Sequence, residues 1–151
     1  MRVTFLGTGS AMPTGERNQT GLLLEAGGDR LLVDCGSGVL GALADTSGGY
    51  ESTDTVLLTH HHLGHVSDLL ALLKARWLVG EEHLTVVGPA GTESPLDDLL
   101  DAHEYLRGRA DLTVRDIEPG TATVAGFDID ATETVHSMDC LAYRVTHDSP
   151  D

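Results

Sequence analysis

Four of the eight histidines in this chain fall within six residues, from His60 to His65. The window follows the apolar run Thr55–Leu58, which predicts a buried strand, and it precedes the leucine-rich run 69–73, which predicts a helix. The histidines therefore occupy the turn at the carboxyl end of a strand, where open α/β sheets bind their ligands. This pattern predicts an α/β domain whose chemistry is located at that turn.

The spacing within the window indicates metal ligation. His60 and His62 are two residues apart, so their rings can point to the same side of an extended segment. Two neutral imidazoles held in this way can bind one zinc ion at about 2.0–2.1 Å. His65 follows a tight turn, and Gly64 suits that turn because glycine tolerates a positive φ. The alternative is a solvated histidine cluster or a purification tag, but a tag is not expected between a strand and a helix.

Length and composition limit the class of protein. A chain of 151 residues with 40% hydrophobic residues can form one domain with a substantial core. Its apolar runs fall short of the roughly 18 residues that a membrane span needs. The segment Met1–Leu6 enters a strand without a visible signal peptide, which predicts a cytoplasmic protein. Cys35 and Cys140 form no disulfide framework, and each is expected to be a small buried residue.

The charge balance is strongly acidic. Nine basic residues face 24 acidic ones, giving a net charge of −15, and Lys74 is the only lysine. Such a surface repels nucleic acid phosphates at ordinary salt concentration. It suits a cytosol of very high salt, where the screening length falls to about 3 Å at 1 M. We interpret the composition as an adaptation to high salt in a halophilic source. If the source is not halophilic, the acidity argues mildly against an RNA substrate.

The remaining pattern predicts a strand-rich domain with a few helices. Strands are expected at 2–6, 22–25, 30–34, 55–58, 84–87, 112–115, 121–124, 127–134 and 141–146. Helices are expected at 39–44, from a Ser67 cap to Trp77, and from a Ser94 cap to just before Gly108. Residues 7–21 form a long polar loop rich in glycine. His103 falls on the apolar face of the third helix, where a packing role is expected.

Three segments resemble a known superfamily. Thr59, His60, His62 and His65 match the metal-binding motif Thr-His-x-His-x-Asp-His of the metallo-β-lactamase superfamily, whereas Gly64 stands where that motif has aspartate. The stretches 6–10, 16–18 and 34–36, with Pro13, look like the opening of its ribonuclease Z branch. The sequence 135–137 followed by 141–144 resembles the third motif, in which a histidine, here His136, ends a strand.

This resemblance implies a fold and a set of ligands. The implied fold is the amino-terminal half of an αββα sandwich, a mixed sheet with helices on one face, in one domain (1–151) that is incomplete at its carboxyl end. His60, His62 and His136 would hold a first zinc ion and leave one coordination position open. His65 would contribute to a second zinc ion. His147 lies at the far end of the strand that follows His136. A strand of that length spans about 33 Å, so its two ends are not neighbours and His147 is not expected to substitute for a missing ligand.

The resemblance also implies a function and partners. The leading interpretation is a zinc-dependent, ribonuclease Z-like hydrolase that cleaves phosphodiesters of RNA, although other small esters remain open. The alternative is an impaired enzyme or a metal-binding assembly module, because Gly64 replaces the motif aspartate and the ligands of the second half are missing. A sheet face without its partner sheet favours a homo-oligomer or association with a carboxyl-terminal half. An α/β domain with an incidental histidine turn is the third interpretation, and it leaves the three motif segments unexplained.

Overall fold

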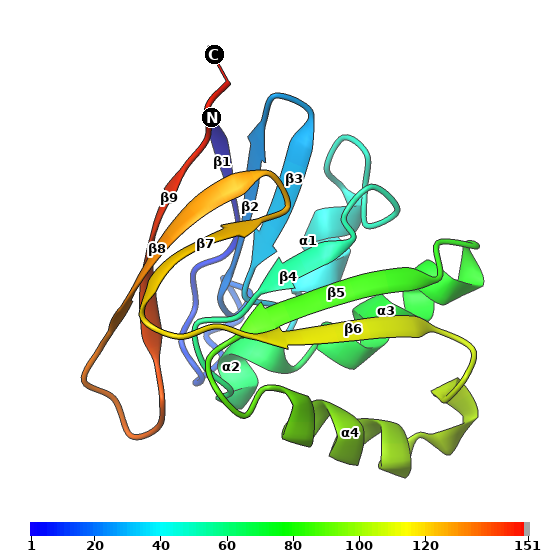
Figure 1. Cartoon of the computed structure of the whole chain (residues 1–151). Helices are drawn as coiled ribbons and strands as arrows, with labels where there is room; N and C mark the ends of the chain where they lie inside the picture. The colour runs from blue at the N-terminus through cyan, green and yellow to red at the C-terminus, as the bar shows by residue number, and fades with distance from the viewer. Residues whose placement is uncertain (150–151) are drawn as a thin grey trace.

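The structure is a computed structural model that describes residues 1–149. Helices cover one face of a large sheet, and a smaller sheet packs on its other face (Figure 1). The large sheet has the order β1 (Arg2–Gly7), β2 (Gly21–Ala26), β3 (Asp29–Val33), β4 (Thr55–Leu57), β5 (His83–Gly88), β6 (Asp111–Asp116). The small sheet contains β7 (Gly120–Val124), β8 (Phe127–Glu133) and β9 (Leu141–Thr146). The helices are α1 (Val39–Ala44), α2 (Leu63–Val66), α3 (Leu69–Leu78), α4 (Glu93–Ala102) and the 3-10 turn η1 (Glu104–Leu106).

The strand directions explain where the histidine window lies. Strands β1, β2 and β3 pair antiparallel, whereas β3, β4, β5 and β6 run parallel to one another. The carboxyl ends of these four parallel strands therefore meet at one edge of the sheet. The histidine window directly follows β4, so it lies in the middle of that edge.

Two apolar cores hold the layers together. Leu23, Leu32, Val56 and Val86 point from the large sheet to the helices, where they pack with residues such as Leu72. The opposite face of the same strands presents Leu24, Leu31, Val33, Leu57 and Val87, which pack against Val124, Phe127, Ile129 and Leu141 of the small sheet. This alternation of faces along each strand is the expected period of two. The mixed sheet with helices on one face is therefore confirmed.

The expectation of a sheet face without a partner sheet is wrong. Strands β7–β9 cover much of that face and bury Phe127 and Ile129 against it. The outer face of the small sheet is polar and exposes Asp128 and Asp130. Uncovered apolar surface remains on β1, where Val3 is 44% exposed and Phe5 is 69% exposed.

Most elements lie where the sequence predicts them, and α1 has the predicted bounds. Both predicted helix caps are wrong. Ser67 ends α2 and donates its hydroxyl to the carbonyl of Leu63, and α3 begins after Asp68. Ser94 lies inside α4, whose first residue is Glu93, so the helix begins one residue before the predicted capping serine. α4 ends at Ala102, so His103 is outside the helix and exposed, not packed on its apolar face.

The loop before β2 folds back along the end of β1. Gly9 donates its amide to the carbonyl of Asn18 at 2.7 Å, and it bridges to Gln19. A side chain at Gly7 would collide with the carbonyl oxygen of Gln19, since a Cβ atom there would lie only 1.6 Å from it. The loop then carries Ala11 to within 3.7 Å of where a Cβ atom of Gly64 would lie. The loop therefore lies beside the histidine window.

Within residues 1–149, every helix lacks the combination of length and hydropathy that a membrane span requires. Cys35 is fully buried as predicted, whereas Cys140 is only partly buried.

Candidate metal centre

The β8–β9 connection brings His136 to the histidine window. Tyr143 of β9 donates its hydroxyl to the carbonyl of Leu58 at 2.7 Å, and Leu141 donates its amide to the carbonyl of Thr59 at 3.0 Å. These two bonds fix the start of β9 against the chain that leaves β4. The loop between β8 and β9 must therefore pass over His60 and His62, and it carries His136 there.

Three histidines converge at this point. One ligating atom from each of His60, His62 and His136 lies within 4.8 Å of the other two. Nε2 of His136 is 3.0 Å from Nδ1 of His62, and the ring centroids of His60 and His136 are 4.6 Å apart. The three rings are mutually edge-on, so their nitrogen atoms can be directed at a common point.

Hydrogen bonds determine which nitrogen of His60 is available. Thr59 donates its hydroxyl proton to Oδ2 of Asp34 at 2.8 Å, so its oxygen accepts from Nδ1 of His60 at 2.9 Å. Nε2 of His60 is then unprotonated and free to bind a metal ion. Burial is the largest of several influences that lower the pKa of His60 to about 4, and the neighbouring His65 contributes next. The ring is therefore a neutral donor at ordinary pH.

The second ring nitrogen of His62 also has a partner. Nε2 of His62 lies 3.3 Å from Oγ of Ser137, the residue after His136. With Nδ1 turned toward His136, a proton on Nε2 can be donated to that hydroxyl. Outer partners of this kind fix the tautomer and the orientation of a ligating imidazole.

Asp34 holds His65 next to the triad. Oδ2 of Asp34 accepts from Nδ1 of His65 at 2.7 Å, and Oδ1 accepts from the amide of Thr59 at 2.8 Å. The ring centroids of His65 and His60 are 4.1 Å apart, but His65 is not among the three histidines whose ligating atoms converge. Its Nε2 remains available for a ligand. Asp34 is 2% exposed and has a φ of 60°, a conformation that aspartate tolerates better than most residues.

Gly64 does not adopt the positive φ predicted for it. It belongs to the single-turn helix α2, in which the amide of His65 donates to the carbonyl of His62 at 2.9 Å. His62 is extended, and the helix begins at the next residue, Leu63. The closest neighbour of a Cβ atom at Gly64 would be Ala11 at 3.7 Å, an ordinary contact distance. The backbone at position 64 therefore accepts a side chain.

Other histidines lie outside this cluster. His147 pairs with Asp29 at 3.0 Å and packs against Phe127, so it cannot reach the site, as predicted. The ring of His61 turns the other way and contacts Thr92 at 2.8 Å. Burial lowers the pKa of His61.

Sequence reasoning gave no role to Asp34 or Ser137. Asp34 had a detectable signal, because it is a carboxylate at the end of the apolar run Leu31–Val33. A carboxylate buried at that point needs hydrogen-bond donors, which indicates a structural or functional role. Ser137 had no such signal, since its importance depends on a contact with a residue 75 positions away.

A cavity of about 590 Å³ lies beside His136. The turn after β5, the link between β6 and β7, and the β8–β9 loop form its walls. Carboxylates of Glu118, Glu133 and Asp139 line it. His136, one of the three histidines, therefore borders an open cavity.

The donor set fits zinc. Three neutral imidazoles with one remaining position are a usual arrangement for catalytic zinc, and imidazole is a donor that zinc favours. The bonds to Thr59 and Ser137 leave the complementary ring nitrogens of His60 and His62 for that ion.

Solved structures share this architecture. YhfI of Bacillus subtilis, a metallo-β-lactamase fold protein, superposes with a TM-score of 0.76 at 30% identity, covering 95% of this chain and 57% of that one. The short form of human tRNase Z has a TM-score of 0.74 at 21% identity and covers 97% and 64%. Zn(2+)-bound PqqB of Methylobacterium extorquens has a TM-score of 0.73 at 16% identity and covers 99% and 60%. The fold is that of the metallo-β-lactamases.

Sequence comparison narrows this class. Ribonuclease Z of Methanopyrus kandleri is 38% identical over 144 residues, which are 93% of this chain and 48% of that protein. Ribonuclease Z of Halorubrum lacusprofundi is 34% identical over 151 residues, or 98% and 48%. The chain thus spans about half the length of these curated relatives. A family model described as Anti-Pycsar protein Apyc1 matches residues 1–143, so the chain belongs to that family and corresponds to the amino-terminal half of a ribonuclease Z-like metallo-β-lactamase protein.

Proposed function

We propose that this chain is a zinc-dependent hydrolase of the ribonuclease Z-like branch and that its substrate is a phosphodiester of RNA. The convergence of His60, His62 and His136 is the observation that carries this proposal. His65, held by Asp34, is proposed as a ligand for a second ion. When bound, zinc lowers the pKa of a water molecule and polarises a phosphoryl oxygen.

The residues around the triad have defined parts in this chemistry. Thr59 and Ser137 hold the rings of His60 and His62 in the orientation that leaves one nitrogen of each free. The loop that carries His136 also forms a wall of the adjacent cavity, so a substrate there is presented directly to the site. Proximity of this kind supplies much of the rate of a hydrolytic reaction.

The choice of substrate rests on the relatives and on the cavity. Curated relatives are named ribonuclease Z, which supports RNA. Glu118, Glu133 and Asp139 line the cavity, and these carboxylates favour a smaller ester with little negative charge at ordinary salt. A comparison of an RNA substrate with a small phosphodiester, each at low and high salt, distinguishes the two substrate classes.

A second candidate function follows from Gly64. The superfamily motif has a carboxylate at this position, and here no side chain is present to hold a second ion or to accept a proton. A single-zinc binding or assembly module, or a disabled enzyme, is consistent with this difference. The relevant partner would be a second copy of the chain or a carboxyl-terminal half, and the exposed Val3 and Phe5 give such a partner apolar surface.

Metal content is the first test. We expect dialysed protein to contain at least one zinc ion per chain, because His60, His62 and His136 form one three-imidazole ligand set. His62→Ala is expected to abolish this binding because it removes one of the three donors. His103→Ala removes an exposed histidine outside the cluster and serves as the control.

Each result of this test has a separate meaning. About two ions per chain, with a mass of a dimer, would indicate that a second copy supplies the remaining ligands and would favour an active hydrolase. One ion lost only in His62→Ala would support the three-histidine site. Protein that binds no zinc under any condition would refute the proposed site.

Gly64→Asp is the test for a disabled enzyme. The backbone accepts this side chain, so we expect a folded protein that binds a second ion and hydrolyses bis(4-nitrophenyl) phosphate at least about tenfold faster, a modest gain for an added metal and base. Gly41→Asp is the matched control, because Gly41 is also helical and a Cβ atom there meets open space. If Gly64→Asp takes up a second ion without faster hydrolysis, ligands other than a carboxylate at position 64 limit the reaction and the disabled-enzyme explanation is rejected.

A further inference from the structure

The fourth histidine of the window, His61, stands between two of the proposed ligands but faces away from them. The rings of His60, His62 and His136 lie within 4.6–4.8 Å of one another, whereas Nε2 of His61 is 2.8 Å from Oγ1 of Thr92. Thr92 immediately precedes α4, beyond the end of β5. His61 therefore connects the segment after β4 to the segment after the neighbouring parallel strand.

The direction of this hydrogen bond follows from the other contact of Thr92. The hydroxyl of Thr92 donates its one proton to the carbonyl of Pro89 at 2.7 Å. Toward His61 the hydroxyl oxygen can only accept, so Nε2 of His61 carries the proton and donates it. The chain His61 to Thr92 to Pro89 thus has a single consistent polarity.

Thr92 is itself held on several sides. Its side chain is completely buried, and its amide donates to Oδ1 of Asp116 at 3.3 Å. The amide of Gly91 donates to Oδ2 of the same carboxylate at 2.9 Å. Asp116 ends β6, so Thr92 is anchored to two strands of the sheet. A donor bonded to Thr92 is therefore attached to a rigid part of the protein.

This attachment bears on the metal site because His61 lies between two ligands. His60 and His62 belong to one extended segment, and a rotation of the backbone at His61 would move both rings relative to His136. Metal sites lose affinity when the groups that orient their ligands are removed.

We propose that His61 is a positioning residue for the metal site: its hydrogen bond to Thr92 fixes the backbone that carries His60 and His62. This inference rests on the proposed zinc site and on no assumption about the substrate. It explains why the window contains four histidines when the triad and His65 require only three of them.

The test measures zinc affinity by competition with a chelator, together with the visible absorption of the Co²⁺-loaded chain. We expect His61→Ala and Thr92→Val each to raise the dissociation constant for zinc about tenfold and to alter the cobalt spectrum. Thr92→Ser keeps the hydroxyl and is expected to retain both properties. The double variant is expected to bind zinc as tightly as either single variant, because the two substitutions remove the same hydrogen bond.

Thr53→Val is the matched control. Thr53 is also completely buried, accepts from a side-chain donor (Arg30, at 3.2 Å) and donates to a backbone carbonyl (Gly49, at 3.3 Å). It precedes β4, at the opposite end of that strand from the histidine window. We expect this variant to lower the thermal unfolding midpoint of metal-free protein without changing zinc affinity or the cobalt spectrum.

The outcomes separate this inference from the proposed function. If the unaltered chain binds no zinc, the proposed site fails. If it binds zinc and His61→Ala binds with the same affinity and spectrum, the site stands and the positioning role is refuted. Equal weakening in Thr53→Val would also refute it, since general destabilisation would then account for the effect.

Discussion

One buried carboxylate organises the histidine window at the level of single residues. Asp34 accepts from the amide and the hydroxyl of Thr59 and from Nδ1 of His65. The same hydroxyl then orients His60. A carboxylate with this many donors is satisfied despite its burial, and it links the end of β3 to the segment after β4.

Gly36 belongs to the same local arrangement. A Cβ atom at Gly36 would lie 2.1 Å from the carbonyl oxygen of Gly64, so only glycine allows α2 to approach the end of β3. The amide of Cys35 donates to the carbonyl of His65 at 2.7 Å across this contact. The sequence Asp34-Cys35-Gly36 is thus required by the close packing beneath the histidines.

The two cysteines should differ sharply in reactivity. Burial, with the carboxylates of Asp68 and Asp34, raises the pKa of the Cys35 thiol above its ordinary range, so no reactive thiolate forms near neutral pH. Cys140 is partly exposed. We expect a thiol reagent such as Ellman's reagent to label one cysteine per native chain and both in denaturant. Cys140→Ser should abolish the native labelling; labelling that persists in this variant would contradict the burial of Cys35.

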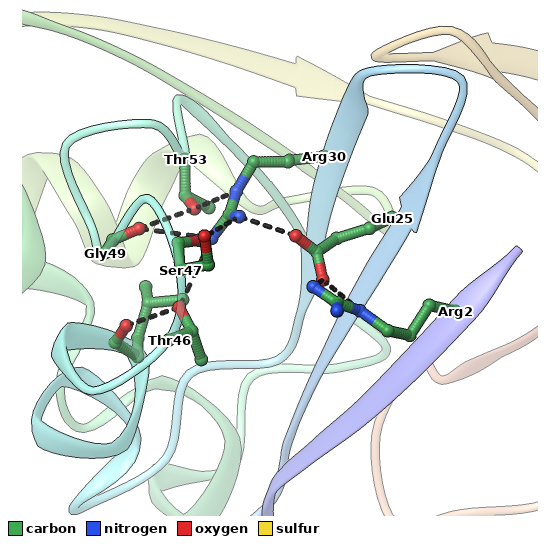
Figure 2. Close-up of polar contacts among 8 residues, drawn as sticks. Arg2, Glu25, Arg30, Thr46, Ser47, Gly49 and Thr53 are labelled. Carbon is green, nitrogen blue, oxygen red and sulfur yellow. Dashed lines mark hydrogen bonds and ion pairs between the residues drawn. The ribbon is translucent and has the colours of Figure 1, made fainter.

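At the level of elements, two arginines hold the loop between α1 and β4. Figure 2 shows Arg30 of β3 directed into this loop, where it donates to the carbonyls of Ser47 at 2.6 Å and Gly49 at 3.2 Å. Glu25 lies between Arg30 and Arg2 and accepts from both (Figure 2). Arg76 of α3 donates to the carbonyls of Tyr50 and Glu51. A loop without regular structure is thereby attached to the sheet and to a helix.

Removal of Arg30 is expected to destabilise the fold. Its side chain is only 12% exposed, and Arg30→Met would leave two loop carbonyls and one carboxylate oxygen without their donor. We expect a loss of about 3 kcal/mol in the free energy of unfolding, measured by urea denaturation.

Arg107→Met is the control for this measurement. The Arg107 side chain is 40% exposed and pairs with Asp97 and Asp101 on the surface, so its removal should cost no more than about 1 kcal/mol. Equal losses in the two variants would contradict the structural role of Arg30.

For the whole molecule, the dominant electrostatic feature is an excess of negative charge. The 24 acidic residues outnumber the nine basic ones, so the summed interaction among the charges is repulsive. Folding brings these charges closer together and increases that repulsion. Two of the nine basic side chains, Arg30 and Arg76, are also held in fixed contacts with the loop before β4. The folded chain is therefore expected to depend on screening of its surface carboxylates.

Salt should stabilise the fold. Raising potassium chloride from about 0.1 M to about 1 M shortens the screening length from about 10 Å to about 3 Å, so we expect the thermal unfolding midpoint to rise. Sucrose at matched osmolality controls for general solvent effects, and chloride avoids the strong salting-out action of sulfate. A midpoint that is unchanged or lower in high salt would refute the halophilic interpretation.

The sequence by itself determined the positions of most strands and the pairing of two of the three converging histidines. Strand positions follow from short-range alternation of apolar residues, and β9 lies at the predicted residues. His60 and His62 could be paired because two residues on one extended segment must share a side. The opposite orientation of His61 follows from the same local geometry.

Only the tertiary structure decided the rest, because the remaining contacts join residues far apart in the chain. His136 reaches His62 from 74 residues away through the packing of the small sheet, and that packing also covers the face that sequence reasoning left open. The hydrogen bonds of Asp34 to Thr59 and His65 likewise cross from one strand end to another. The loop between β1 and β2 also brings Ala11 beside Gly64, and no local propensity specifies that approach.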